Sequence, residues 1–98
     1  MVQKITMEFL DRMQRDADFR ASIVQSSEQD ISMVVGRTLI TSNMQRAKMV
    51  IAISRCLAAL SRDDVLLAMR ERLLKTGEDH LSDGEIVSAT RSVDPDLV

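Results

Sequence analysis

The sequence feature that most constrains the fold is the stretch MVIAISRCLAAL, residues 49–60, in which only Ser54 and Arg55 are polar. Its composition predicts a central helix, over about residues 43–60, that is apolar on nearly every side. Such a helix is stable in water only when other elements or a second copy of the chain cover it. The remaining chain must therefore supply or recruit apolar faces that surround this helix.

Helical spacing recurs along the rest of the chain. Apolar residues three or four positions apart predict amphipathic faces over residues 2–13, 31–39 and 65–74. No segment alternates in the manner of a strand, and 98 residues are enough for one domain with a modest core. We therefore expect an all-α fold, a small helical bundle of four principal helices plus one or two short ones. The domain is expected to span residues 1–92, with a frayed C-terminal tail over residues 93–98.

Local signals predict where the helices begin and end. Capping boxes, in which a hydroxyl is followed three residues later by an acid, predict helix N-termini at Ser27, Ser61 and Ser82. Residues 41–43 are all good N-cap residues for the apolar helix. Gly77 predicts one helix C-terminus, and Pro95 stops the last helix. Asp16 or Asp18 either caps a short second helix or marks a bend in the first one.

Charge is segregated along the chain, although the net charge is only -2. Residues 37–75, the basic segment, hold eight basic and three acidic side chains, a net +5. Residues 76–98, the acidic segment, hold one arginine against six acids, a net -5. Asymmetry of this kind is typical of an interaction surface or an intramolecular contact. We expect the acidic segment to neutralise the basic one when no partner is bound.

The sequence favours a function in protein–protein binding. An apolar helix shared across a two-fold axis predicts a homodimer, and seven methionines supply adaptable apolar surface. The competing interpretation is a monomeric bundle with these methionines in its core. We expect a small non-enzymatic regulator, inhibitor or chaperone-like adaptor that binds another protein. The candidate interaction surface consists of Arg46, Lys48, Met49, Arg55, Arg62 and Arg70.

The alternative function is a DNA-binding transcriptional regulator that uses the basic segment. Nucleic acid is the less favoured partner, because the isoelectric point is about 5.3 and aromatic residues are few. The connections between the expected helices also lack a clear helix-turn-helix turn.

No motif predicts catalysis, a metal or a cofactor. His80 is the only histidine, and the carboxylates near it lie in a turn, so we expect an exposed loop residue. Cys56 lies in the most apolar helix, where a cysteine behaves as a small hydrophobic residue. The three glycines are not clustered, so they form no phosphate-binding loop. The expectation is a protein that is not an enzyme.

The sequence also carries expectations about location. No apolar run approaches the ~20 residues that span a bilayer, and the N-terminus lacks the pattern of a signal peptide. A single cysteine cannot form an internal disulfide, which favours a reducing compartment. We expect a cytoplasmic protein of bacterial or phage origin with no membrane partner.

Two local patterns resemble known families. FLDRMQRDADFRASI, residues 9–23, resembles the opening helices of the nitrogen-fixation-associated leader-peptide domains, although the double-glycine cleavage site of those proteins does not follow. SMVVGRTL, residues 32–39, is similar in pattern to the small enterobacterial biofilm and acid-resistance connector proteins, whose downstream spacing is longer. Each resemblance covers under half of the chain, so neither one assigns a role to a residue.

Overall fold

The expected all-α bundle is confirmed. The computed structural model describes residues 4–38 and 44–97, with side chains described outside residues 34–47. Within these ranges the chain contains no strand, only an isolated bridge between Thr6 and His80. Its elements are the α-helices α1 (Met7–Arg15), α2 (Ala17–Thr38), α3 (Met44–Ala58), α4 (Asp63–Thr76) and α5 (Asp83–Val93) and the 3₁₀ turns η1 (Ala59–Ser61) and η2 (Pro95–Leu97).

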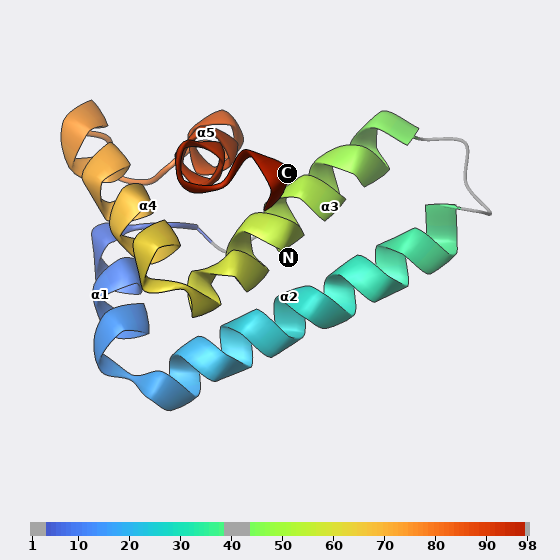
Figure 1. Cartoon of the computed structure of the whole chain (residues 1–98), viewed down its shortest axis with the longest axis horizontal. Helices are drawn as coiled ribbons and strands as arrows, with labels where there is room; N and C mark the ends of the chain where they lie inside the picture. The colour runs from blue at the N-terminus through green and yellow to red at the C-terminus, as the bar shows by residue number, and fades with distance from the viewer. Residues whose placement is uncertain (1–3, 39–43, 98) are drawn as a thin grey trace.

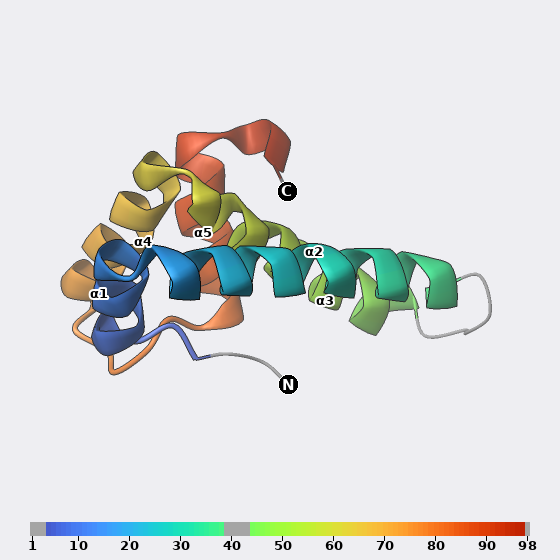
Figure 2. The ribbon, with the colours of Figure 1, turned by 90° about the horizontal axis from the view of Figure 1, so that it is seen from below.

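The helices are arranged as a long hairpin with a compact end. α2 and α3 run antiparallel and make the most extensive helix–helix contact in the chain (Figure 1). α1, α4 and α5 gather around the C-terminal half of α3, while the other half of the hairpin extends away from them (Figure 2). The central apolar helix is thus covered at one end by three other helices.

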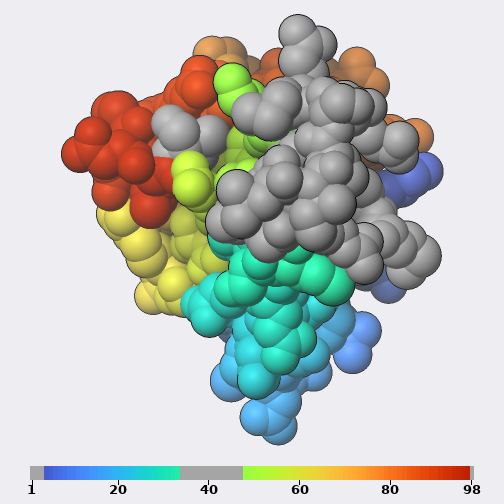
Figure 3. Space-filling model, turned by 90° about the vertical axis from the view of Figure 1, so that its right-hand side faces the viewer, coloured from blue at the N-terminus to red at the C-terminus, as the bar shows by residue number. Residues whose placement is uncertain are grey.

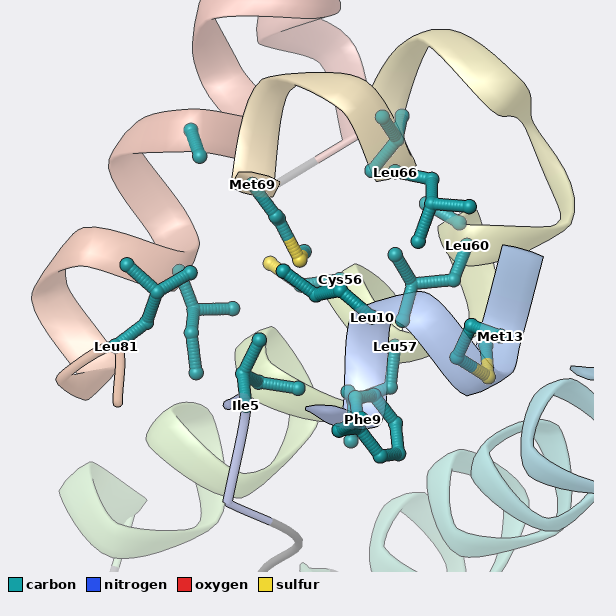
Figure 4. Close-up of a cluster of buried hydrophobic side chains, with 14 of the residues drawn as sticks. Ile5, Phe9, Leu10, Met13, Cys56, Leu57, Leu60, Leu66, Met69 and Leu81 are labelled. Atoms are coloured by element: carbon teal, nitrogen blue, oxygen red, sulfur yellow. The ribbon is translucent and has the colours of Figure 1, made fainter. Parts of the chain in front are cut away.

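The hydrophobic core lies in this compact end. Cys56 and Leu60, from the apolar stretch, are fully buried beside Ile5, Leu10 and Met69 (Figure 4). The described part of the expected apolar face over residues 2–13, from Ile5 to Met13, and the face over residues 65–74 therefore do cover the central helix, while Val2 lies outside the described residues. α5 adds a third face through Leu81, Ile86 and Ala89, which lie on and just before it. Of the face over residues 31–39, Ile31 is half-buried and the side chains beyond residue 33 lie outside the described part.

Several predicted helix boundaries are confirmed. Ser82 caps α5, where its hydroxyl oxygen accepts a hydrogen bond from the Glu85 amide at 3.3 Å. Gly77 ends α4 in the left-handed conformation with φ 68°, and its amide donates to the Leu73 carbonyl at 3.1 Å. α5 ends at Val93, directly before Asp94 and Pro95.

The predicted N-terminus at Ser27 is wrong. α2 runs through this position without a break, because the Ser27 hydroxyl donates to the Ile23 carbonyl at 2.8 Å instead of capping a new helix. Asp16 is the residue that begins α2, since its carboxylate accepts from the Phe19 amide at 3.1 Å. The two alternatives for residues 16–24 are therefore resolved as a cap at Asp16 that opens one helix of 22 residues.

The helix predicted to begin at Ser61 does begin close by, at Asp63, but the predicted cap at Ser61 is wrong. Ser61 belongs to the 3₁₀ turn η1, and the N-cap position of α4 is Arg62, whose side chain makes no capping bond. The carboxylate of Asp64 instead accepts from the Val65 amide at 2.9 Å, inside the first turn. The N-cap expected at residues 41–43 lies outside the described residues.

The described residues before α1, residues 4–6, are not helical, and Thr6 has an extended backbone. The first helix begins at Met7, because the Thr6 hydroxyl oxygen accepts from the Phe9 amide at 3.1 Å. Ile5 is therefore not on the helix, yet it is completely buried. Its carbonyl accepts from the Leu81 amide at 3.0 Å, which ties the N-terminal segment to the connection between α4 and α5. At the other end of the chain, η2 places Leu97 against the core.

Candidate functional site

The structure divides the predicted interaction surface among separate places. Lys48 and Met49 lie in a groove between α3 and α5. Arg55 and Arg62 line a second hollow, beside η1 and η2. Arg70 bonds to α1, and the side chain of Arg46 lies outside the described part of the chain. The five residues whose side chains are described therefore do not line one common hollow.

The α3–α5 groove is an open hollow of about 570 Å³. Met49 and Ala52 of α3 and Val87 of α5 give it an apolar lining. Lys48, Arg91 and Asp83 are its charged residues, and Gly84 and Ser88 complete it. Figure 3 looks at this side of the molecule, where described residues of α3 lie directly beside α5.

Helical periodicity explains why α5 can line a groove. Ile86, Ala89 and Thr90 are buried in the core, so the residues between them must face elsewhere. Gly84, Val87, Ser88 and Arg91 follow the spacing i, i+3, i+4, i+7 and form the face beside α3. Sequence reasoning missed this face. The spacing of small and apolar residues was visible in the sequence, but the helix that packs beside it was not.

The groove carries a net positive charge among its lining residues. Lys48 and Arg91 make no ion pair with any side chain described in residues 4–33 or 48–97. Asp83 is the only acid in the lining, and it lies in the first turn of α5, where the helix dipole favours a negative charge. The lining therefore combines apolar residues with two basic residues and one acid.

Arg62, in the second hollow, is engaged by acids of its own chain. Its Nη2 and Nε donate to the two carboxylate oxygens of Asp64 at 2.8 and 3.1 Å, and its Nη1 donates to Asp94 at 3.0 Å. These hydrogen bonds raise the pKa of Arg62 and lower the pKa of Asp64. Arg55, by contrast, is exposed and makes no ion pair within the described side chains.

Two other arginines of the basic segment are also paired. Arg70 donates to Asp11 at 2.5 Å and to Gln14 at 3.0 Å, joining α4 to α1. Arg72 lies 3.4 Å from a Glu85 carboxylate oxygen and joins α4 to α5. Together with the bond between Arg62 and Asp94, this contact shows acids of the acidic segment neutralising arginines of the basic segment. The two segments meet as fixed pairs within the fold.

The two residues considered for chemistry, His80 and Cys56, lie in different surroundings. His80 is exposed in the connection between α4 and α5. Cys56 is completely buried, and burial raises the pKa of its thiol, against the opposing effects of the Thr90 hydroxyl and the Arg91 charge. In residues 4–38 and 44–97, histidine, cysteine and acidic side chains do not gather in threes as metal ligands would.

Large apolar side chains remain exposed on three helices. Met49 and Val50 on α3 and Met33 on α2 are 49%, 38% and 51% exposed, whereas Met13 and Met69 are fully buried. The methionines therefore serve both as core and as surface. Leu67 and Leu74 of α4 are 49% and 67% exposed.

We name the outward row Leu67, Glu71 and Leu74 the α4 ridge, since residues spaced i, i+4, i+7 lie on one face of a helix. Glu71 is exposed and pairs with none of the described basic side chains. The ridge thus presents two leucines with an acid between them.

Comparison with known proteins leaves the site to be interpreted from its own geometry. No protein-family model matches the chain, and no curated protein or solved structure matches it. None of the helices in the described ranges combines the length and the apolar character needed to cross a membrane.

Proposed function

We propose that this chain is a small non-enzymatic regulator or adaptor that acts by binding protein, and that it pairs with itself as a homodimer. The observation that carries the proposal is the half-exposed Met49 in the α3–α5 groove. A flexible thioether in an open apolar groove is typical of surfaces that bind protein helices. Burial of Met49 and Val87 by a partner would remove apolar surface from water, which is the main driving force of association.

The charges of the basic segment support protein over nucleic acid as the partner. Arg62, Arg70 and Arg72 each donate to or lie beside an acid of this chain. A phosphate backbone would have to displace these acids, which lowers the gain from neutralising phosphates. The DNA-binding alternative therefore depends on the other cations of the basic segment, of which Lys48, Arg55 and Lys75 have described side chains.

The proposal includes a non-enzymatic role in the cytoplasm. The only histidine is exposed in a loop, and the only thiol is buried and held protonated by its raised pKa. A thiol in that state is a poor nucleophile. One buried cysteine needs no oxidising compartment, in keeping with a cytoplasmic location.

Size-exclusion chromatography with light scattering at several protein concentrations tests the pairing. We expect the mass to rise from the 11.0 kDa of one chain toward twice that value as the concentration increases. A mass that stays at one chain over the whole range would contradict the homodimer.

A further inference from the structure

We propose that the α3–α5 groove of one molecule receives the α4 ridge of a second copy of this chain. The inference rests on the proposed function, because it requires self-association, and it names the two surfaces that meet. The ridge consists of Leu67, Glu71 and Leu74, and the groove centres on Met49 and Val87.

The first argument is apolar complementarity. Leu67 and Leu74 are both about half or more exposed, and seven residues of helix place them about 10 Å apart along α4. An open groove lined by Met49, Ala52 and Val87 offers apolar contacts to a helix laid along it. Met49 can adapt its shape to a leucine, because its side chain is unbranched and flexible.

The second argument is charge complementarity. Glu71 lies between the two leucines and pairs with no described basic residue. Lys48 and Arg91 border the groove and pair with no described acid. When the ridge lies in the groove, Glu71 comes beside Lys48 and Arg91. This charge complementarity favours the ridge over an uncharged or basic helix as the partner of the groove.

The other exposed apolar side chains fit the groove less well. Met33 lies in a shallow hollow whose remaining described lining is Gln25, Glu28, Gln29 and Ser32, so it offers a single apolar contact. Val50 is the least exposed of the described large apolar side chains on the surface, at 38%. Among the side chains described in residues 4–33 and 48–97, the ridge alone presents two strongly exposed leucines and an acid on one helical face.

Two single variants test the pairing of these surfaces, each made in the full chain. Met49→Glu places an acid in the groove opposite Glu71, and Leu74→Glu removes the most exposed leucine of the ridge. Each variant alone is expected to self-associate at least about tenfold more weakly than the wild type, as for the loss of a central interface residue. Met33→Glu is the matched control, because Met33 is as exposed as Met49 but belongs to neither surface.

Mixing the two variants gives the decisive result. The Met49→Glu chain keeps an intact ridge and the Leu74→Glu chain keeps an intact groove, so one contact remains possible between them. Light scattering of the equimolar mixture should show a two-chain complex at a concentration at which neither variant forms one. Circular dichroism and thermal unfolding of each variant check that the helices are intact, as expected for changes at exposed positions.

The outcomes separate this inference from the proposed function. A wild type that associates, with both variants associating equally well, would overturn the inference while the homodimer stands. Variants that are both monomeric and remain so when mixed would also overturn it. A wild type that stays monomeric at every concentration would overturn the homodimer together with the inference.

Discussion

The carboxylate of Asp16 accepts a hydrogen bond from the amide of Phe19 at 3.1 Å, and this bond begins the longest helix of the molecule. Downstream, Ser27 turns its hydroxyl back to the Ile23 carbonyl, so it leaves α2 unbroken. One side chain caps the helix, and the other, despite its capping-box sequence, does not.

Replacing these two residues by alanine should have unequal effects. Asp16→Ala removes the cap and should lower the free energy of unfolding by about 1 kcal/mol. Ser27→Ala should change it by less than about 0.5 kcal/mol, because alanine favours the helix and the Ile23 carbonyl remains within the helical ladder. Urea unfolding followed by circular dichroism measures both values. A cost at Ser27 equal to that at Asp16 would indicate a helix start at Ser27 and would contradict the continuous α2.

The methionines should differ in their contribution to stability. Met69→Ala leaves a cavity in the core and should lower the free energy of unfolding by about 2–5 kcal/mol. Met33→Ala, at a half-exposed position, should change it by less than about 0.5 kcal/mol. Chemical unfolding of both variants gives the comparison. Equal losses would contradict the division of the methionines between core and surface.

The Cys56 thiol should react only when the protein unfolds. Burial raises the pKa of Cys56 in the folded state, so folding favours the protonated thiol. Its contribution to stability is complete below the ordinary pKa of a thiol and is lost as the pH rises through the raised folded-state pKa. We therefore expect slow alkylation of the native protein at neutral pH and rapid alkylation in denaturant, both measured by mass spectrometry.

The stability of the wild type should also fall at alkaline pH by more than that of Cys56→Ala, in which this titration is absent. Native-state alkylation as fast as that in denaturant would show that the thiol is accessible. A Cys56→Ala variant with the same alkaline decline would show that the thiol does not cause the decline.

The acids that neutralise the basic segment should limit its binding to nucleic acid. Deleting the acidic segment cannot test this point, because Ile86, Ala89 and Thr90 belong to the core. Asp94→Asn together with Glu85→Gln removes one of the two acids that contact Arg62 and the acid beside Arg72, while leaving α5 in place. The double variant should bind duplex DNA several-fold more tightly than the wild type at low salt, with an affinity that falls steeply as salt is added.

Fluorescence anisotropy with labelled duplex DNA measures this difference. Wild-type protein that binds as tightly as the double variant, with the same salt dependence, would instead favour the DNA-binding function.

Local sequence patterns predicted much of this fold. The apolar spacing correctly identified the faces from Ile5 to Met13 and over residues 65–74 that cover the central helix, although the first helix begins only at Met7. Ser82 and Gly77 were predictable because an N-cap hydroxyl and a left-handed glycine act within a few residues of chain. The failure at Ser27 has a physical reason. A serine hydroxyl can cap a new helix by accepting a hydrogen bond from a backbone amide, but inside a helix it can instead donate to the carbonyl four residues back, as Ser27 does to Ile23.

The candidate site was less predictable, because it depends on which helices pack together. Lys48 and Met49 were identified from the sequence, but Val87 and Arg91 join them only because α5 packs against α3. The bond between Arg62 and Asp94 spans 32 positions in the sequence. Charge segregation indicated that such pairs exist without specifying the partners.

Methionine methyl NMR of the wild-type protein, recorded as a function of concentration, tests the central claim most directly. The chain carries seven methionines, and Met49 and Met33 are equally exposed on neighbouring helices. Binding in the α3–α5 groove should shift the Met49 methyl signal as the concentration rises and leave the Met33 signal unchanged. A Met49 signal that does not depend on concentration would contradict self-association through this groove.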